Sequence, residues 1–465
     1  MNFQAAWDFK PRFMVQQIVF FVVTALALGY AVKQFLRLRR NILLGKDEVI
    51  AGDSIQRWRN VALIAFGQKK MFKQFIPAFF HFFIYTAFLM TQVELIEIFI
   101  DGLFGVHRFF APILGGLYTF IISFIEVLSI MAFVATFIFL ARRNLLKVPR
   151  FFKPEMKGWP SLDGNLILVF EMILLIGIFS MNGADVLLQK MDPSHYSDTG
   201  TLAVSSWLGP ALFGGLDQST LMVIERFGWW IHILMVFIFL NYLPKSKHLH
   251  IIFAFPNTYY AKLTPRGEME NMPEIMNEVK SMMGLGGEEE AMAEESELPE
   301  FGANDIFDLS WKNILDAYSC TECGRCTAAC PANITGKKLS PRKIMMDIRD
   351  RTEEIALNLD NGNMECAKDK EKPLDKTNYD DGKSLFDYIS PEELHACTTC
   401  NACVEACPVL INPLDPILKM RRYEILTLSQ GPSDWLPLFN SIENGGSAWA
   451  MSVDRDKWAK DVTGE

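Results

Sequence analysis

The sequence predicts an all-α protein in which a five-helix transmembrane bundle is followed by a helical domain with two cysteine motifs. Half of the 465 residues are hydrophobic, and the long apolar runs lie within roughly the first 250 residues. All nine cysteines follow residue 319, and eight of them form two motifs of the same pattern. The segments beside these motifs have the apolar spacing of helices rather than strands.

Five apolar runs are long enough to cross a bilayer, which takes about 20 residues of helix. None has a lysine or arginine in its middle. They cover roughly residues 13–35, 75–100, 113–141, 166–188 and 221–243. With their connections they define a membrane domain over residues 1–260. The N-terminus lacks the pattern of a cleaved secretory signal, so we expect the first helix to be retained.

Basic residues are concentrated in two connections, the one after the first run and the one after the third. Because loops rich in lysine and arginine stay on the cytoplasmic side, these connections belong inside. We therefore expect a multi-pass protein of the bacterial inner membrane, with a periplasmic N-terminus and a cytoplasmic cysteine-rich segment. That compartment keeps thiols reduced, and metal binding is their commoner use there.

Ionisable side chains inside the apolar runs are costly unless they are ligated, paired or neutral. Glu94 and Glu97 lie toward the outer end of the second run, where we expect a solvated interfacial face. For Glu126, in the third run, we favour a protonated carboxyl that hydrogen-bonds to a neighbouring helix. A proton path or a quinone contact is the alternative for Glu126.

Histidines in the second and fifth runs lie at depths that suit a haem. His232 and His250 are 18 residues apart, which places them on one face of an unbroken helix, roughly 27 Å apart. Pro244 lies between them and is able to kink that helix. His81 lies near the inner end of the second run and is expected to face His250. We predict that His81 and His250 bind one b-type haem near the cytoplasmic face, with His248 as the competitor of His250.

These features resemble the membrane gamma subunit of respiratory nitrate reductase and the related membrane subunits of heterodisulfide reductase and sulfite-reduction complexes. The resemblance covers about residues 10–260 and rests on FFHFFI around His81, WWIH at His232 and LPKSKHLHIIFAFP through His250. It implies two b haems between the second and fifth helices and a quinol site toward the outer haem. Thr91 stands where the other second-helix histidine is expected. The number of haems, one or two, therefore stays open. Three roles are open for His232: a haem ligand with an unusual partner, a quinone contact or a packing residue.

An acidic linker over residues 261–300 separates the two domains. It contains MGLGGEEEAMAEESELPE, which is too charged to pack a core alone. We expect a solvated tether with a short helix around residues 273–283. The linker supplies much of the formal charge of −9, and no basic surface for nucleic acid is indicated.

Two cysteine motifs, CTECGRCTAACP and CTTCNACVEACP, begin 77 residues apart. Three cysteines at intervals of three suit three corners of a [4Fe-4S] cluster, and the fourth, followed by proline, serves the other cluster in two-cluster ferredoxins. The predicted ligands are a first set, Cys320, Cys323, Cys326 and Cys407, and a second set, Cys397, Cys400, Cys403 and Cys330. Zinc is the alternative, but it usually takes two separated pairs of ligands.

The helical surroundings of the motifs resemble the α-helical ferredoxin domain of the small heterodisulfide reductase subunit and the cluster region of succinate dehydrogenase iron-sulfur subunits. This resemblance runs over residues 301–430 and implies an α-helical dicluster ferredoxin domain. Cys366 lies outside both motifs and is expected to be a free thiol without function. The tail, residues 431–465, resembles the segment that precedes a cysteine-rich CCG domain in larger relatives. It implies docking of a separate cytoplasmic redox chain with CCG domains in a hetero-oligomeric complex.

No nucleophile and base pair, P-loop or dinucleotide fingerprint is recognisable, so no catalytic side chain is expected and the cofactors carry the chemistry. The leading hypothesis is an electron relay between membrane quinone, haem b, two [4Fe-4S] clusters and a cytoplasmic partner. That partner is a disulfide reductase-like protein or a dehydrogenase such as an electron-transfer flavoprotein system. One alternative is a redox-sensing or assembly anchor without net quinone turnover. Another is a transporter, which the lack of paired broken helices disfavours.

Overall fold

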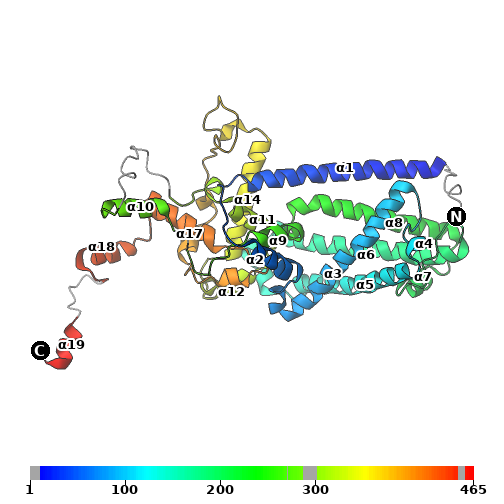
Figure 1. Ribbon diagram of the computed structural model, residues 1–465, viewed down its shortest axis with the longest axis horizontal. Coiled ribbons are helices and arrows are strands. Elements are labelled where there is room, and N and C mark those ends of the chain that lie inside the picture. Colours follow the sequence, from blue (N-terminus) through cyan, green and yellow to red (C-terminus); the bar gives the residue numbers. More distant parts are fainter. Residues whose placement is uncertain (1–10, 270, 286–300, 449–455, 465) are drawn as a thin grey trace.

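The computed structural model of the protein describes residues 11–269, 271–285, 301–448 and 456–464. These residues form helices and irregular segments, with two isolated β-bridges and no strand among them. Long helices lie side by side in one half of the molecule, and shorter helices pack across one end of them (Figure 1). The predicted all-α fold is confirmed.

Five helices in the described part of the chain have the length and apolar composition of membrane spans. They are α1 (Pro11–Ile42), α3 (Phe75–Phe104), α5 (Gly116–Asn144), α6 (Trp159–Met191) and α8 (Gln218–Tyr242). Each covers most or all of one predicted run. Large apolar side chains such as Leu26 on α1 and Phe120 on α5 are exposed, as contact with lipid requires.

The fifth membrane helix ends before His250, although the histidine spacing was interpreted on one unbroken helix. α8 stops at Tyr242 and is followed by the 3-10 turns η6 (Leu243–Lys245) and η7 (Lys247–Leu249). Pro244, in η6, has no N–H to continue an α-helix. His250 is instead the first residue of a separate helix, α9 (His250–Tyr259). The expectation that His232 and His250 share one face of an unbroken helix is therefore wrong.

Short helices fill the connections at both ends of the bundle. Beside the cysteine motifs lie α2 (Ser54–Asn60), η2 (Val61–Phe66), η3 (Met71–Lys73), η4 (Pro149–Phe151) and η5 (Pro154–Met156). At the opposite end, which we call the outer end, lie α4 (Ala111–Leu114) and α7 (Ser205–Phe213).

Residues 301–430, which we call the cysteine domain, are built from short helices around one longer one. They are η8 (Ile306–Asp308), α11 (Trp311–Tyr318), α12 (Arg325–Ala329), α13 (Pro331–Ile334), α14 (Pro341–Asp360), η9 (Met364–Cys366), η10 (Leu385–Asp387), α15 (Pro391–His395), α16 (Ala402–Ala406), α17 (Leu414–Arg422) and η11 (Tyr423–Thr427). The tail adds α18 (Trp435–Gly445) and α19 (Lys457–Thr463). The predicted linker helix is confirmed as α10 (Pro273–Met282), whereas the most acidic part of the linker, residues 286–300, lies outside the described residues.

The cysteine domain shares its hydrophobic core with the bundle. Leu38 and Ile42 at the end of α1, and Leu249 in η7, belong to the same buried cluster as Ile314 and Ile344 of the cysteine domain. The backbone pairs here too, because the N–H of residue 46 donates to the carbonyl of residue 309 at 2.7 Å. The cysteine domain is therefore fixed directly on the ends of the membrane helices.

Helices α6 and α8 meet closely at two glycines. A Cβ on Gly228 would stand 2.7 Å from the carbonyl oxygen of Gly177 and 2.7 Å from the backbone nitrogen of Met181. Small residues allow such backbone approach between membrane helices. This contact sets the position of His232, which follows Gly228 by one turn of α8.

We expect Gly228→Ala to push α6 and α8 apart and to lower the free energy of unfolding by about 1–3 kcal/mol relative to a neutral glycine replacement. The matched control is Gly116→Ala in α5, whose added Cβ meets no heavy atom within 4 Å. Thermal unfolding midpoints in detergent would compare the two variants. Equal midpoints would contradict the close contact.

Candidate functional site

The two cysteine motifs adopt the same local backbone. The residue before the second cysteine is left-handed in both, with φ of 53° at Glu322 and 55° at Thr399. Its N–H donates to the sulfur of the first cysteine, at 3.4 Å in the first motif and 3.5 Å in the second. The residue after the second cysteine, Gly324 or Asn401, is left-handed as well. These turns wrap the chain around the thiols and aim backbone N–H groups at sulfur.

The fourth cysteine of the first motif lies with the second motif. Helices α12 and α16, which carry the third cysteine of each motif, pack against each other. One cavity is lined by all four cysteines of the second set, Cys330, Cys397, Cys400 and Cys403. Leu414 and Ile417 of α17 also line this cavity. The fold thus brings the second set around one space.

The fourth cysteine of the second motif lies with the first motif. Burial raises the pKa of the Cys320 thiol to about 12, and the nearby charges of Glu322, Cys323 and Cys407 add to that increase. Burial also raises the pKa of Cys407 to about 12, with the Cys323 thiolate as the next cause. Charge interactions weaken with separation, so thiols that raise one another's pKa lie close together. The members of the first set therefore lie near one another.

No three His, Cys, Asp or Glu side chains in the ranges that the structure describes converge as the ligands of a single metal ion. A [4Fe-4S] cluster has four irons and is held by four separate thiolates, which need not meet at one point. The eight motif cysteines carry no disulfide. Their chemistry, eight thiols in two groups of four, fits two such clusters.

Cations lie near the first set, two from the membrane domain's connections, Lys70 and Arg150, and one from the first motif itself, Arg325. Burial lowers the pKa of Lys70 to about 8, although the Cys407 thiolate acts to raise it. Burial also lowers the pKa of Arg150 and of Arg325, and the Cys323 thiolate opposes that shift in both. The second set faces outward by comparison, since the Cys400 side chain is exposed.

Glu322 is a charged carboxylate between the first two cysteines. Burial by itself raises its pKa, but the positive charges of Arg349 and Lys247 outweigh that effect and hold the pKa below its usual value. The guanidinium of Arg349 lies 2.9 Å from the Glu322 carboxylate. Glu322 therefore carries a negative charge beside the first set.

Three histidines gather at the end of the bundle that carries the cysteine domain. The rings of His248 and His250 are 5.1 Å apart between centroids. Burial lowers the pKa of His248 well below its usual value, and charge on His250 and on His81 lowers it further. The structure thus brings His81, on α3, close to His248 and His250, the two candidate ligands that follow the fifth membrane helix.

Each predicted haem ligand has its Nδ1 hydrogen-bonded. His81 Nδ1 lies 3.1 Å from the side-chain oxygen of Gln68. His250 Nδ1 donates to the carbonyl of Lys247 at 3.2 Å, and His232 Nδ1 to the carbonyl of Leu174 at 3.2 Å. Metal-ligating histidines typically donate one ring N–H to such an acceptor, which leaves the other nitrogen for the metal. The three side chains fit that role.

His232 lies apart from this group, buried between α8 and α6 with 3% of its surface exposed. Thr91, at the position of the absent histidine, donates its hydroxyl to the Phe88 carbonyl of its own helix at 3.1 Å. The structure therefore does not make Thr91 a partner for His232. Ligation of a second haem by His232 stays a prediction.

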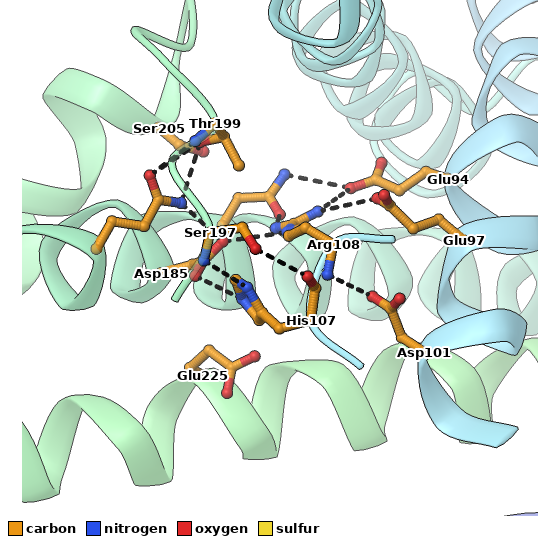
Figure 2. Close-up of polar contacts among 12 residues, drawn as sticks. Glu94, Glu97, Asp101, His107, Arg108, Asp185, Ser197, Thr199, Ser205 and Glu225 are labelled. Carbon is orange, nitrogen blue, oxygen red and sulfur yellow. Dashed lines mark hydrogen bonds and ion pairs between the residues drawn. The ribbon is translucent and has the colours of Figure 1, made fainter. Parts of the chain in front are cut away.

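The outer end of the bundle holds a buried polar network around Arg108 (Figure 2). The guanidinium donates to Asp185 at 3.1 Å and to Asn182 at 2.5 Å, both on α6. It also pairs with Glu94 at 3.6 Å and Glu97 at 3.7 Å. Both glutamates are only 1% exposed. The expected solvated face is therefore wrong, because Arg108 enters from the connection and compensates their charge inside the bundle.

Glu126 hydrogen-bonds to a neighbouring helix, as expected, whereas its protonated state stays a prediction. Its carboxylate accepts from the backbone N–H groups of Val204 at 2.8 Å and Ser205 at 3.1 Å, at the start of α7. Free N–H groups at a helix N-terminus favour a carboxylate there. The contact explains why this acidic side chain is buried.

Arg108, Glu322 and Lys247 are structural partners that sequence patterns did not single out. For Glu322, the sequence offered one indication: the first motif has a glutamate where the second motif has Thr399. No sequence pattern pointed to Arg108, because its hydrogen-bond partners Asn182 and Asp185 follow it by 74 and 77 residues.

Comparison with known proteins assigns the cysteine domain. Residues 319–411, which contain all eight motif cysteines, match the family model of the 4Fe-4S dicluster domain. The chain thus has a C-terminal 4Fe-4S dicluster domain, and this part of the fold prediction is confirmed. No solved structure matches significantly.

Curated relatives extend the similarity into the membrane domain. The chain is 28% identical over 463 residues to a probable iron-sulfur-binding oxidoreductase, FadF, of Bacillus subtilis, covering 95% of this chain and 60% of the relative. It is 27% identical over 423 residues to the EtfAB:quinone oxidoreductase of Syntrophomonas wolfei, covering 88% and 54%. It is also 30% identical over 112 residues to one subunit of the ferredoxin:CoB-CoM heterodisulfide reductase of Methanosarcina mazei, covering 24% and 48%. The chain spans three-fifths or less of the length of these relatives.

We expect Arg108→Gln to lower the free energy of unfolding by about 3–5 kcal/mol, because it leaves buried carboxylates without their cation. Lys190→Gln, which removes an exposed cation at the end of α6, is the control and should have little effect. Thermal unfolding in detergent distinguishes the two. A stable Arg108→Gln protein would mean that the network does not hold the outer end together.

Proposed function

We propose that this chain is a membrane-bound electron-transfer protein that carries electrons between quinone and a soluble redox partner, through haem b and two [4Fe-4S] clusters. The observation that carries the proposal is the position of the first cysteine set. Glu322 and Arg325 of the first motif contact Lys247 and Met71, near the histidines at the end of the bundle, whereas Cys400 of the second set is exposed. The 4Fe-4S dicluster match and the relative named EtfAB:quinone oxidoreductase support the same conclusion.

The proposed cluster ligands are the crossed sets. The cavity lined by Cys330 together with Cys397, Cys400 and Cys403 supports the second set. The mutual charge effects of Cys320, Cys323 and Cys407 support the first set. When bound, such clusters exchange electrons at a potential that depends on net charge, hydrogen bonds to sulfur and solvent exposure. The chain supplies all three through its cations, its turn N–H groups and the burial of the first set.

The proposed haem ligands are His81 and His250, with His248 as the alternative to His250. Their Nδ1 hydrogen bonds and their common position near the first set support this choice. Arg325 of the first motif also contacts Met71, just before α3, with its guanidinium 3.4 Å from the Met71 carbonyl. A haem at these histidines would thus adjoin the first set.

The second set is the proposed side for the redox partner. Cys400 is exposed, and α18 beyond it presents the apolar side chains Leu436, Phe439 and Ile442. Trp435 anchors α18 on His395, two residues before Cys397, with ring centroids 5.0 Å apart. We propose that a cytoplasmic chain, such as one with CCG domains, docks here in a hetero-oligomeric complex. The basic connections support the proposal that this side faces the cytoplasm and the N-terminus the periplasm of a bacterial inner membrane.

Cysteine replacement tests the crossed ligation. We expect Cys330→Ser and Cys397→Ser to lose the same half of the cluster iron, and Cys407→Ser and Cys320→Ser to lose the other half. The control is Cys366→Ser, because Cys366 lies outside both sets. Iron analysis and electron paramagnetic resonance of the remaining cluster report the outcome. If Cys330→Ser resembled Cys320→Ser instead, each motif would serve its own cluster.

Histidine replacement tests the link to quinone. His81→Ala and His250→Ala should lose the reduced b-type absorption and slow reoxidation of the clusters by a soluble quinone analogue. The exposed His195, at the outer end, gives the control His195→Ala. Loss of haem in His248→Ala but not in His250→Ala would move the ligand to His248. Unchanged reoxidation in the haem-free variants would favour an anchor or sensor over a relay.

A further inference from the structure

Lys247 connects the histidine end of the bundle to the first cysteine motif. Its carbonyl oxygen accepts from Nδ1 of His250 at 3.2 Å. Its ammonium group lies 2.5 Å from Glu322, between Cys320 and Cys323. The side chains of Lys247 and Glu322 are 9% and 2% exposed. One residue therefore contacts both a proposed haem ligand and the proposed cluster-binding turn.

The pair belongs to a network of alternating charges. Asp163 of α6 accepts from the backbone N–H of Lys247 at 3.1 Å and from the Tyr242 hydroxyl at 2.5 Å. The ammonium of Lys247 lies 3.9 Å from the same carboxylate. On the other side of Glu322 stands Arg349 of α14, at 2.9 Å. Two cations and two carboxylates thus alternate from the membrane domain into the cysteine domain.

The corresponding turn of the second motif, between its first two cysteines, has no such pair. Thr399, the counterpart of Glu322, has the same left-handed backbone, yet it is only half-buried and donates its hydroxyl to the Thr398 carbonyl at 2.8 Å. The turn therefore forms without a carboxylate. Buried ion pairs often add little net stability, so stability alone does not account for Glu322 and Lys247.

We propose that Lys247 is a positioning residue that tunes the cluster held by the first set, by neutralising Glu322 beside it while its carbonyl orients His250. This inference rests on the proposed function, because it takes the first set as cluster ligands. It assigns to Lys247 a direct influence on the cluster of the first set.

The direction in which Lys247 and Glu322 shift the midpoint potential of the first cluster follows from their charges. Reduction adds one negative charge to a cluster. A nearby net positive charge therefore favours reduction, and a nearby net negative charge disfavours reduction. Removing the ammonium of Lys247 leaves Glu322 less compensated and should make the first cluster harder to reduce. Removing the charge of Glu322 leaves Lys247 and Arg349 in excess and should make the same cluster easier to reduce.

The test is a redox titration of both clusters, followed by electron paramagnetic resonance, in the full-length protein purified in detergent. We expect a lower midpoint potential for one cluster in Lys247→Met and a higher one for the same cluster in Glu322→Gln. Lys247→Arg keeps the charge and should stay near wild type. Thr399→Val, at the equivalent position of the second motif, should leave the first cluster unchanged.

An unchanged first-cluster potential in both charge-removing variants would overturn the inference, and so would an equal shift of both clusters. If Lys247→Met does not accumulate, the result for Glu322→Gln decides alone, because glutamine preserves the size of the side chain. Failure of the proposed function is separate from these outcomes. If the first set does not hold a cluster, the wild-type protein would lack that cluster's signal; if only the relay to quinone fails, both signals remain and the clusters are not reoxidised by a quinone analogue.

Discussion

The attachment of the first cysteine motif to the ends of the membrane helices is the constraint on which the rest of the structure depends. Arg342 of α14 is fully buried and binds the Arg150 carbonyl at 2.8 Å and the Glu155 carboxylate at 2.7 Å, both in the connection between α5 and α6. Breaking a buried pair of this kind leaves an uncompensated charge and is costly. Together with the shared apolar core, these contacts hold the cysteines in a fixed position relative to the histidines.

Positive charge in the membrane domain is used differently at its two ends. In the basic connections, Lys70 and Arg150 lie beside thiols of the first set, where they compensate charge that thiolates or a bound cluster would carry. At the outer end Arg108 compensates carboxylates that belong to the bundle itself. The same physical requirement, charge neutrality in a medium of low dielectric constant, therefore organises both ends of the helices.

Helix positions, the fold class and the dicluster domain could be predicted because hydropathy and cysteine spacing are properties of contiguous residues. The course of the chain after the break at Pro244 was harder to predict, since it is fixed by Asp163, which lies 79 residues from Tyr242 and binds both Tyr242 and the start of η7. The burial of Glu94 depended on an arginine from another segment. Likewise Lys247 and Glu322 are 75 residues apart. Contacts of this kind are fixed by tertiary packing and leave no local pattern.

The central claim is that two [4Fe-4S] clusters and a haem b occupy one continuous assembly of side chains. Its most direct test is a cofactor count on wild-type protein purified in detergent, with iron, acid-labile sulfide and pyridine haemochrome measured on the same sample. The account predicts about eight cluster irons and one haem per chain. Two haems would mean that His232 has a partner other than Thr91. Clusters without any haem would contradict the proposed relay to quinone.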